Sequence, residues 1–287
     1  MKQIKMIAAA AAAMLSASAA LSVSAADEIM TFRIDAKDSA VCLDNMTEDA
    51  VLKGAVYIDN YTGLTSLRLI LKSDEPVVIE NGDFTRHPDK KDSQGEALHR
   101  LFEEHADVDY MQYSEITKES NVILWYSKGF VNDEPAKISD ATSSFVNFDI
   151  RVPKGTKPGD YKLYISTDVK TNEANQKEED FFAYGGKDQL VLDQNVKLTP
   201  LDIAVYLLGD TNLDGTVDIQ DAQLTLKAYT EGIAGKKSNL TPAQVKAADV
   251  NANNEVGVDD AQLILKYYTE KYVAGRADTT WDKLLGK

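Results

Sequence analysis

A twelve-residue acidic pattern that occurs twice near the end of the chain constrains its fold more than any other feature. The first copy is DTNLDGTVDIQD, residues 210–221, and the second is DVNANNEVGVDD, residues 249–260. The segments that continue from them, DAQLTLKAYTE and DAQLILKYYTE, differ only at Thr225/Ile264 and Ala228/Tyr267. Repetition of both the loop and the segment after it indicates a duplicated loop–helix unit rather than two chance acidic turns.

The oxygen-bearing side chains of the first copy have the spacing of a loop that wraps a hard cation. A cation such as Ca²⁺ takes six to eight oxygens at about 2.3 to 2.6 Å, and glycine at the sixth position makes the sharp bend. Gly215 holds that position. The predicted ligands of this loop are Asp210, Asn212, Asp214, the carbonyl of Thr216, Asp218 and Asp221.

The second copy is less regular but still legible as a calcium loop. Its predicted ligands are Asp249, Asn251, Asn253, Glu255 and Asp260. Asn254 replaces the glycine, and asparagine tolerates the left-handed backbone that the bend needs. Gly257 stands at position nine, where a ligand often acts through water. We therefore expect two calcium sites, of which the first binds more tightly.

Apolar residues follow each loop at helical spacing, which predicts two amphipathic helices. The residues expected to form the buried stripes are Ala222, Leu226 and Tyr229 in the first helix and Ala261, Leu265 and Tyr268 in the second. The segment LTPAQVKAAD, residues 240–249, is expected to form a linker helix between them. Two such helices face to face would make a small core.

These features together resemble a dockerin, the module that attaches proteins to cellulosome-type assemblies. Residues 209–274 carry the resemblance: Asp rather than Glu stands at position twelve, and no helix enters either EF-hand-like loop. The resemblance implies calcium-dependent folding and binding to a cohesin of a larger scaffold. The partner contacts that it implies are Ile219, Gln220, Leu224, Lys227, Val258, Asp259, Leu263 and Lys266. The first pair, Ile219-Gln220, differs from Val258-Asp259, which disfavours the near-symmetric two-way docking of some dockerins. Single and dual docking modes both stay open.

Short apolar runs separated by Gly, Pro, Asn and Asp fill the chain up to residue 208 and predict a β-sandwich or barrel. The runs include AVLKGAVYIDN, LTSLRLILKSD, EPVVIENGDF, NVILWYSKGF, FVNFDIRVP, DYKLYISTDV and QLVLDQNVKL. Within SQGEALHRLFEEHADVDYM, the helical spacing of Leu98, Leu101 and Phe102 predicts one short helix. The run LDIAVYLLGD leads directly into the first loop, so we expect the two domains to lie close together.

Two of these stretches resemble parts of a cohesin. They are GAVYIDNYTGLTSLRLILKSDEPVVIENGDF, which is similar to the opening strands, and VNFDIRVPKGTKPGDYKLYIS, which is similar to a later strand–turn–strand unit. The resemblance implies a cohesin-like β-sandwich or jelly roll at residues 27–208, followed by an all-α dockerin at residues 209–287. Such a chain resembles an adaptor scaffoldin, which docks on a larger scaffold, receives dockerin-bearing enzymes or other components, and performs no catalysis.

Two other kinds of first domain stay open, a carbohydrate-binding module and a small glycoside hydrolase. Glu80, Glu103 and Glu104 could form a catalytic carboxylate pair, but nothing in the sequence singles them out. Trp125 is the one tryptophan before the first acidic loop, which disfavours a flat aromatic platform for sugars.

The remaining features indicate a secreted protein. Residues 1–26 have a basic start, an apolar run and small residues at the end, as in a signal peptide. No later stretch is long and apolar enough to span a membrane, and a net charge of −15 disfavours nucleic acid as a partner. We expect an extracellular protein held non-covalently in a cell-surface complex. Cys42 is expected to be a buried thiol in a strand, and His87, His99 and His105 are expected on the surface or in loops.

Overall fold

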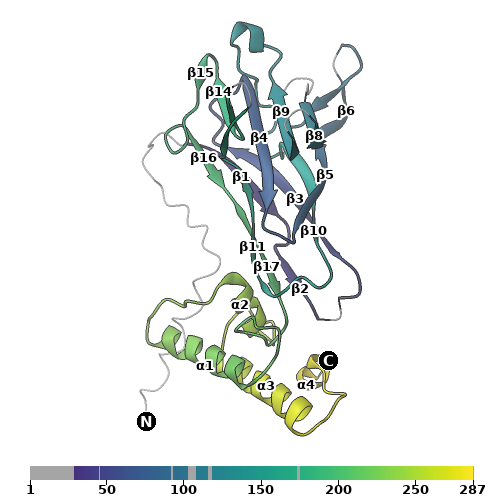
Figure 1. The fold of residues 1–287 in the computed structure, drawn as a ribbon, viewed down its shortest axis with the longest axis vertical. Coiled ribbons are helices and arrows are strands. Elements are labelled where there is room, and N and C mark those ends of the chain that lie inside the picture. Colours follow the sequence, from purple (N-terminus) through teal and green to yellow (C-terminus); the bar gives the residue numbers. More distant parts are fainter. Residues whose placement is uncertain are drawn as a thin grey trace, which may run out of the picture.

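The computed structural model describes residues 29–44, 46–91, 93–102, 108–115, 118–172 and 175–286. Strands occupy the first part of the chain and helices the last part, and Figure 1 shows the helices gathered at one end of a sandwich of strands. The predicted signal peptide, residues 1–26, lies outside the described residues.

Most of the predicted runs form strands, but residues 190–195 of the run QLVLDQNVKL do not, and the strands at residues 86–91, 97–99 and 108–114 lie outside the predicted runs. They are β1 (Met30–Ala36), β2 (Ala40–Cys42), β3 (Ala50–Asp59), β4 (Ser66–Ser73), β5 (Val78–Phe84), β6 (Arg86–Lys91), β7 (Ala97–His99), β8 (Val108–Ser114), β9 (Glu119–Tyr126), β10 (Val146–Val152), β11 (Gly159–Ile165), β12 (Val169–Thr171), β13 (Lys177–Glu179), β14 (Phe182–Gly185), β15 (Asp188–Gln189), β16 (Val196–Thr199) and β17 (Leu201–Tyr206). A 3₁₀ turn, η1 (Phe130–Asn132), follows β9.

Two main sheets form the sandwich. One has the order β16-β1-β3-β10-β5, and the other has the order β15-β14-β4-β11-β17-β2, with β9 paired to β4 and β8 paired to β9. Most neighbours are antiparallel, but β1 pairs with β16, and β17 with β2, in parallel. Two further hairpins, β6-β7 and β12-β13, complete the strand-rich part.

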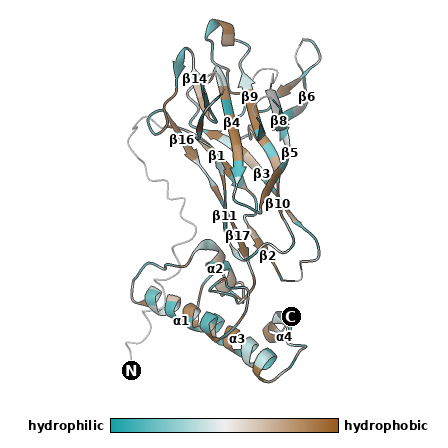
Figure 2. Cartoon of the chain, in the orientation of Figure 1, coloured by the Kyte–Doolittle hydropathy of each residue, from teal (hydrophilic) through white to brown (hydrophobic). Residues whose placement is uncertain are grey.

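Apolar and polar residues alternate along the strands, so the apolar face of each sheet packs into a shared core. On β1, Met30, Phe32 and Ile34 are buried, and Figure 2 shows hydrophobic and hydrophilic residues alternating along the strands. Trp125 is fully buried and stacks on Phe102, with ring centroids 4.7 Å apart. The one tryptophan of this part of the chain therefore belongs to the core and offers no surface to a ligand.

The short helix predicted around Leu98, Leu101 and Phe102 is wrong for the described residues 93–102 and 108–115. Ala97–His99 forms β7, which pairs with β6, and Phe102 forms a bridge with Ile138. Leu101 and Phe102 are both buried in the sandwich core. A short apolar run fits a helix or a strand by spacing alone, and here packing against the sheets decides for extended backbone.

One histidine and the cysteine also lie differently from what we expected. His99 is fully buried: the Leu101 N–H donates to its Nδ1 over 3.0 Å, so its Nε2 carries the proton and donates to the Phe145 carbonyl over 2.9 Å. Cys42 does lie in a strand, but it is exposed. Partial burial raises the pKa of this thiol to about 11, so it is protonated at neutral pH. His105 lies outside the described residues.

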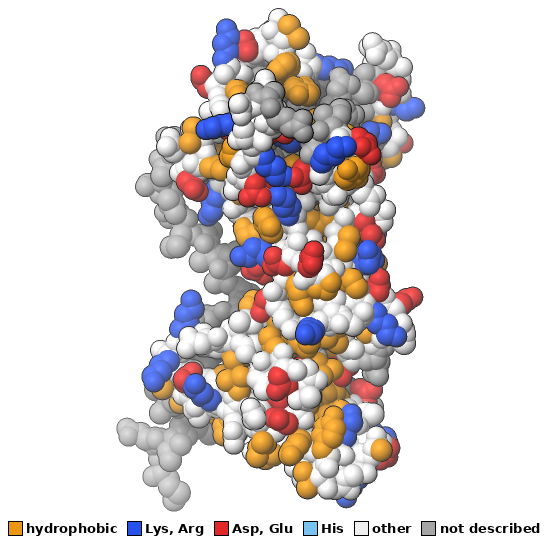
Figure 3. Space-filling model, in the orientation of Figure 1, with side chains coloured by type: hydrophobic (Ala, Val, Ile, Leu, Met, Phe, Trp, Pro, Cys, Tyr) orange, Lys and Arg blue, Asp and Glu red, His pale blue; other side chains and the backbone are white. Residues whose placement is uncertain are grey.

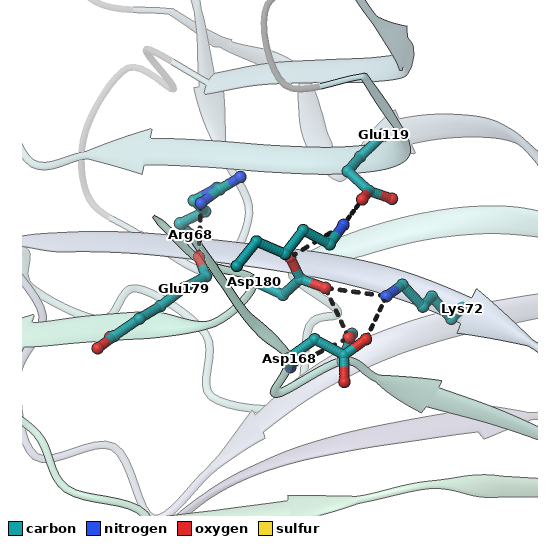
Figure 4. A network of polar contacts seen from close by, with 8 residues as sticks. Arg68, Lys72, Glu119, Asp168, Glu179 and Asp180 are labelled. Carbon is teal, nitrogen blue, oxygen red and sulfur yellow. Dashed lines mark hydrogen bonds and ion pairs between the residues drawn. The ribbon is translucent and has the colours of Figure 1, made fainter. Parts of the chain in front are cut away.

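A polar network fastens the β12-β13 hairpin to the outer face of β4 (Figure 4). The Asp180 carboxylate, 3% exposed, accepts from the Ser166 hydroxyl over 2.7 Å and from the Lys72 ammonium over 2.9 Å. Arg68 donates to the carbonyl of Glu179 over 2.5 Å. Burial works to raise the pKa of Asp180, but the Ser166 hydroxyl and the Lys72 ammonium outweigh it and hold that pKa below its usual value.

Replacing Asp180 by Ala is expected to destabilise the strand-rich part by about 1–3 kcal/mol, because Ser166 loses its acceptor in a buried site. Asp168→Ala is the matched control, since Asp168 contacts the same lysine but is 65% exposed, and it should cost less than about 1 kcal/mol. Because the folded pKa of Asp180 is lowered, its contribution is complete above the unfolded pKa of about 3.9 and is lost as the pH falls below that value. Urea unfolding at pH 7 measures both variants, and equal midpoints would contradict this assignment.

The helical part follows β17 without a linker. Its elements are α1 (Ile219–Ile233), α2 (Pro242–Ala248), α3 (Val258–Tyr268), a π-helical turn η2 (Thr269–Val273) and α4 (Trp281–Leu285). The α2 helix is the predicted linker helix and ends directly before Asp249, so the expectation that no helix enters either loop is wrong for the second loop. It lies against β17 and β11, and the Ala243 N–H donates to the Asp160 carboxylate over 2.9 Å. The Leu208 N–H donates to Asp44 over 2.8 Å. The two parts of the chain are therefore in direct contact, as the absence of a linker predicts.

Candidate functional site

The carboxylates at positions one and twelve accept the same backbone hydrogen bonds in both acidic loops. In the first loop, Asp210 accepts from the backbone N–H groups of Asp214 and Gly215, over 3.1 and 2.9 Å, and Asp221 accepts from those of Asn212 and Asp218, over 2.9 and 2.7 Å. In each loop the carboxylate at position one therefore binds the turn at positions five and six, while the carboxylate at position twelve binds positions three and nine. The corresponding acceptors in the second loop are Asp249 and Asp260.

The backbone of both loops bends through left-handed residues at the same two positions. Leu213 and Gly215 have φ values of 62° and 92° in the first loop, and Ala252 and Asn254 have 61° and 65° in the second. Asn254 thus adopts the conformation expected of it. Leucine and alanine rarely occur in this region, and such local strain is typical of loops built around a ligand.

The charges of the loops fit a bound cation. Asp210, Asp221 and Asp260 are fully buried, and no lysine or arginine within the described ranges forms an ion pair with any of them. Burial raises the pKa of Asp210 to about 6 and also raises the pKa of Asp221 and of Asp260. Buried carboxylates without a basic partner are costly unless a metal ion neutralises them, so these residues suit Ca²⁺.

Carboxylates alone do not complete either set of ligands. No three His, Cys, Asp or Glu side chains in the described part of the chain converge closely enough to hold a metal by themselves. Ca²⁺ also takes amide and carbonyl oxygens, which Asn212, Asn251 and Asn253 and the position-seven carbonyls of Thr216 and Glu255 can supply.

The buried stripe predicted for the two helices is wrong in part. Ala222 and Ala261 are buried as expected, but Leu226 and Leu265 are 42% and 43% exposed. The positions where the two copies differ are buried instead: Thr225 and Ala228 on α1, and Ile264 and Tyr267 on α3, and the two helices are in contact. Thr225 shares a hydrogen bond with Thr211 of the first loop, and Tyr267 stacks on Trp281 of α4, so the two copies have different neighbours at these positions.

The exposed leucines belong to an apolar line on each helix. Residues spaced by seven in an α-helix lie on one face. Apolar stripe one consists of Ile219, Leu226 and Ile233 on α1. Apolar stripe two consists of Val258 and Leu265 on α3 together with Tyr272 in the π-helical turn η2 that follows. Each of these residues is at least 39% exposed. Figure 3 shows hydrophobic side chains reaching the surface in the helical part. The sequence predicted Ile219 and Val258 as partner contacts but missed the other four, although their repetition at equal positions was a visible signal.

The other predicted contact residues divide by exposure. Gln220, Lys227, Asp259 and Lys266 are exposed beside the stripes, whereas Leu224 and Leu263 are half-buried. Leu263 packs against the small core of the helical part. The structure thus favours Leu226 and Leu265 over Leu224 and Leu263 as side chains that a partner could reach.

The carboxylates nominated for catalysis are not brought together as a described pair. Glu80 forms an ion pair with Arg151 over 3.2 Å, and Glu103 and Glu104 lie outside the described residues. No helix among the described residues has the length and apolar composition to cross a membrane.

Comparisons with known proteins agree with the geometry of the helical part. Residues 208–268 match the family model described as "Dockerin type I domain". No curated protein matches the chain.

Solved structures of cohesins are similar to the strand-rich part at low identity. The third ScaB cohesin of R. flavefaciens, solved in complex with a group 1 dockerin, is 12% identical, with a TM-score of 0.39, over 64% of this chain and 97% of that one. The third ScaC cohesin of Acetivibrio cellulolyticus, in complex with the ScaB dockerin, is 14% identical, with a TM-score of 0.39, over 62% and 99%. A non-cellulosomal cohesin from Archaeoglobus fulgidus is 12% identical, with a TM-score of 0.35, over 61% and 91%.

The helical part unites two matched acidic loops, buried carboxylates without basic partners and a family match over the same residues. Residues 208–268 of this chain are therefore a type I dockerin domain, joined directly to a β-sandwich.

Proposed function

We propose that the chain is a non-catalytic adaptor of a cellulosome-type complex. Its dockerin binds a cohesin of a larger scaffold in the presence of calcium, and its β-sandwich acts as a cohesin that receives dockerin-bearing enzymes or other components. The observation that carries the proposal is the pair of exposed apolar stripes beside two acidic loops within a dockerin domain. Repeated exposed apolar lines rimmed by polar residues are typical of protein-binding surfaces.

The calcium ions are proposed to bind in the two acidic loops. In the first loop the ligands are Asp210, Asn212, Asp214, Thr216, Asp218 and Asp221, and in the second they include Asp249, Asn251, Asn253, Glu255 and Asp260. The ions would neutralise the buried carboxylates and hold the start of α1 and α3. The apolar stripes, with Gln220, Lys227 and Lys266 beside them, would then form the scaffold-binding face.

The receiving role of the β-sandwich is supported by the resemblance of residues 54–84 and 146–166 to cohesin stretches. Those stretches form β3, β4, β5, β10 and β11, which belong to both main sheets. We also propose that residues 1–26 direct secretion and that the mature protein joins an extracellular complex through its dockerin.

Size-exclusion chromatography of the calcium-loaded chain with a cohesin-bearing scaffold and a dockerin-bearing enzyme tests the proposal. The three proteins are expected to elute together. Leu226→Ala with Leu265→Ala should abolish scaffold binding and leave enzyme binding unchanged, because apolar anchors at an interface centre dominate its affinity. Val169→Ala, at an exposed apolar residue of β12, is the control and should change neither. Failure of the sandwich to retain any dockerin from a panel of secreted proteins would contradict its receiving role.

One observation favours a carbohydrate-binding sandwich as the second candidate. Tyr126 and Tyr184 flank Ser66 in one row across β9, β4 and β14, and Phe130 packs against Tyr126 with ring centroids 5.0 Å apart. Tyr126 and Phe130 are 42% and 44% exposed. If this surface binds sugars, Tyr126→Ala should lower retention in polysaccharide gels; the adaptor proposal expects no retention by the unmodified chain.

A further inference from the structure

The two acidic loops carry a carboxylate at opposite members of one pair of positions, nine and eleven. The first loop has Asp218 at position nine and Gln220 at position eleven. The second loop has Gly257 at position nine and Asp259 at position eleven. One carboxylate has thus changed place by two residues between the copies, while the numbers of residues in the loops are equal.

The Asp259 side chain turns back onto its own loop. Its Oδ1 occupies the space into which a side chain at residue 257 would project. Its Oδ2 accepts a hydrogen bond from Nδ2 of Asn251, the predicted ligand at position three, over 2.7 Å. The carboxylate therefore lies where the side chain of a position-nine ligand would begin, and it contacts a neighbouring ligand.

The first loop shows a different arrangement of the same positions. Nδ2 of Asn212 donates to Asp214 within the loop, over 2.9 Å, and the Asp218 carboxylate accepts from the Gln220 N–H over 2.6 Å. Gln220 is exposed. The side chain of Gln220 thus forms no described hydrogen bond with Asn212, whereas the side chain of Asp259, at the same position of the second loop, forms one with Asn251.

Asp259 shares its loop with other carboxylates. Asp249 and Asp260 belong to the same loop, and no basic side chain in the described part of the chain forms an ion pair with Asp259. A free carboxylate on an exposed first turn would lower its energy by pointing away from other carboxylates. A cation in the loop reverses that preference.

We propose that Asp259 supplies to the calcium ion of the second loop the oxygen that Asp218 supplies in the first loop. This inference rests on the proposed calcium binding. It makes the second loop a complete site despite its glycine at position nine, and it removes Asp259 from the set of partner contacts.

Calorimetric titration of the full chain with CaCl₂ tests the assignment. Asp259→Gln gives the second loop the position-eleven residue of the first, and it should weaken one of the two sites by about tenfold, because calcium affinity follows the number of ligand charges. Gly257→Asp combined with Asp259→Gln places the carboxylate as in the first loop and should restore the affinity. The φ of Gly257 is −121°, which any residue can adopt. Gln220→Ala is the matched control at position eleven of the first loop and should change neither site.

Each outcome decides a separate point. If Asp259→Gln leaves the calcium affinity of both sites unchanged, the assignment is wrong. If that variant binds the scaffold more weakly in saturating calcium, Asp259 is a partner contact instead. If Gly257→Asp combined with Asp259→Gln does not recover the calcium affinity of the second loop, the assignment is also wrong, even if Asp259→Gln alone folds poorly. If the unmodified chain binds no calcium, the proposed function itself fails.

Discussion

Excess EDTA is expected to remove most of the helical circular dichroism signal of the chain while the β-sandwich stays folded. The helical part has a small core of six buried residues, Val217, Ala222, Val250, Ile264, Tyr267 and Trp281, and the chain's one cysteine, Cys42, lies outside it. A core of this size supplies about 3–5 kcal/mol at most. Calcium at about a thousand times its dissociation constant adds about 4 kcal/mol, so its removal takes away a comparable amount.

The electrostatics of the loops also favour unfolding of the helical part when calcium is removed. Asp210 and Asp221 are fully buried, and burial together with neighbouring carboxylates of the same loop raises the pKa of each, so without a cation their charges oppose the folded loop. Circular dichroism during a calcium titration after EDTA treatment measures the effect, and the helical signal should return. A signal and melting temperature that persist in EDTA would show that calcium is incidental to the fold.

The two loops should contribute unequally to this effect. Asp210→Ala removes a fully buried carboxylate from the first loop, whereas Asp249→Ala acts on the less regular second loop. We expect the first loop to bind calcium more tightly, because four carboxylates belong to it by position. Calorimetry of the two variants resolves the sites, and equal affinities would contradict the order.

Gly209→Ala is expected to abolish the separate melting transition of the dockerin even in saturating calcium. Gly209 has a φ of 87°, and a Cβ there would stand 2.5 Å from the indole ring of Trp281. Trp281 stacks on Tyr267 with ring centroids 4.2 Å apart and an interplanar angle of 6°. The indole therefore joins the start of the first loop to the end of α3, and it cannot stay there beside an added methyl group.

Trp281→Ala should destabilise the dockerin as much as Gly209→Ala does, because it removes the indole ring itself. Loss of a buried tryptophan costs about 3–5 kcal/mol, which equals the whole contribution of a core this small. Gly235→Ala is the matched control for the alanine substitution, because Gly235 also has a positive φ, 71°, but open space around its would-be Cβ. It should cost only about 1 kcal/mol. Differential scanning calorimetry measures all three, and similar losses for Gly209 and Gly235 would show that the indole contact adds nothing.

The sequence by itself determined the elements that depend on local spacing. The twelve-residue period fixed which side chains can converge in each loop, and the left-handed backbone at Asn254 followed from the tolerance of asparagine for that region. Strands such as β3, β4 and β10 followed from runs in which apolar residues alternate with polar ones, because a strand directs successive side chains to opposite faces. The ligand positions proposed for the first loop were predicted without tertiary information.

Only the tertiary structure decided which face of each element meets its neighbour. Helical spacing placed Ala222, Leu226 and Tyr229 on one side of α1, but packing against α3 buried Thr225 and Ala228 and left Leu226 exposed. The buried His99 and the extended backbone at Leu101 likewise depend on sheets built from residues distant in the chain. The turn of Asp259 onto its own loop depends on the absence of a side chain at Gly257, because Asp259 Oδ1 lies where the Cβ would be. Spacing constrains which residues share a face, whereas the shape and volume of the neighbouring element select the face that is buried.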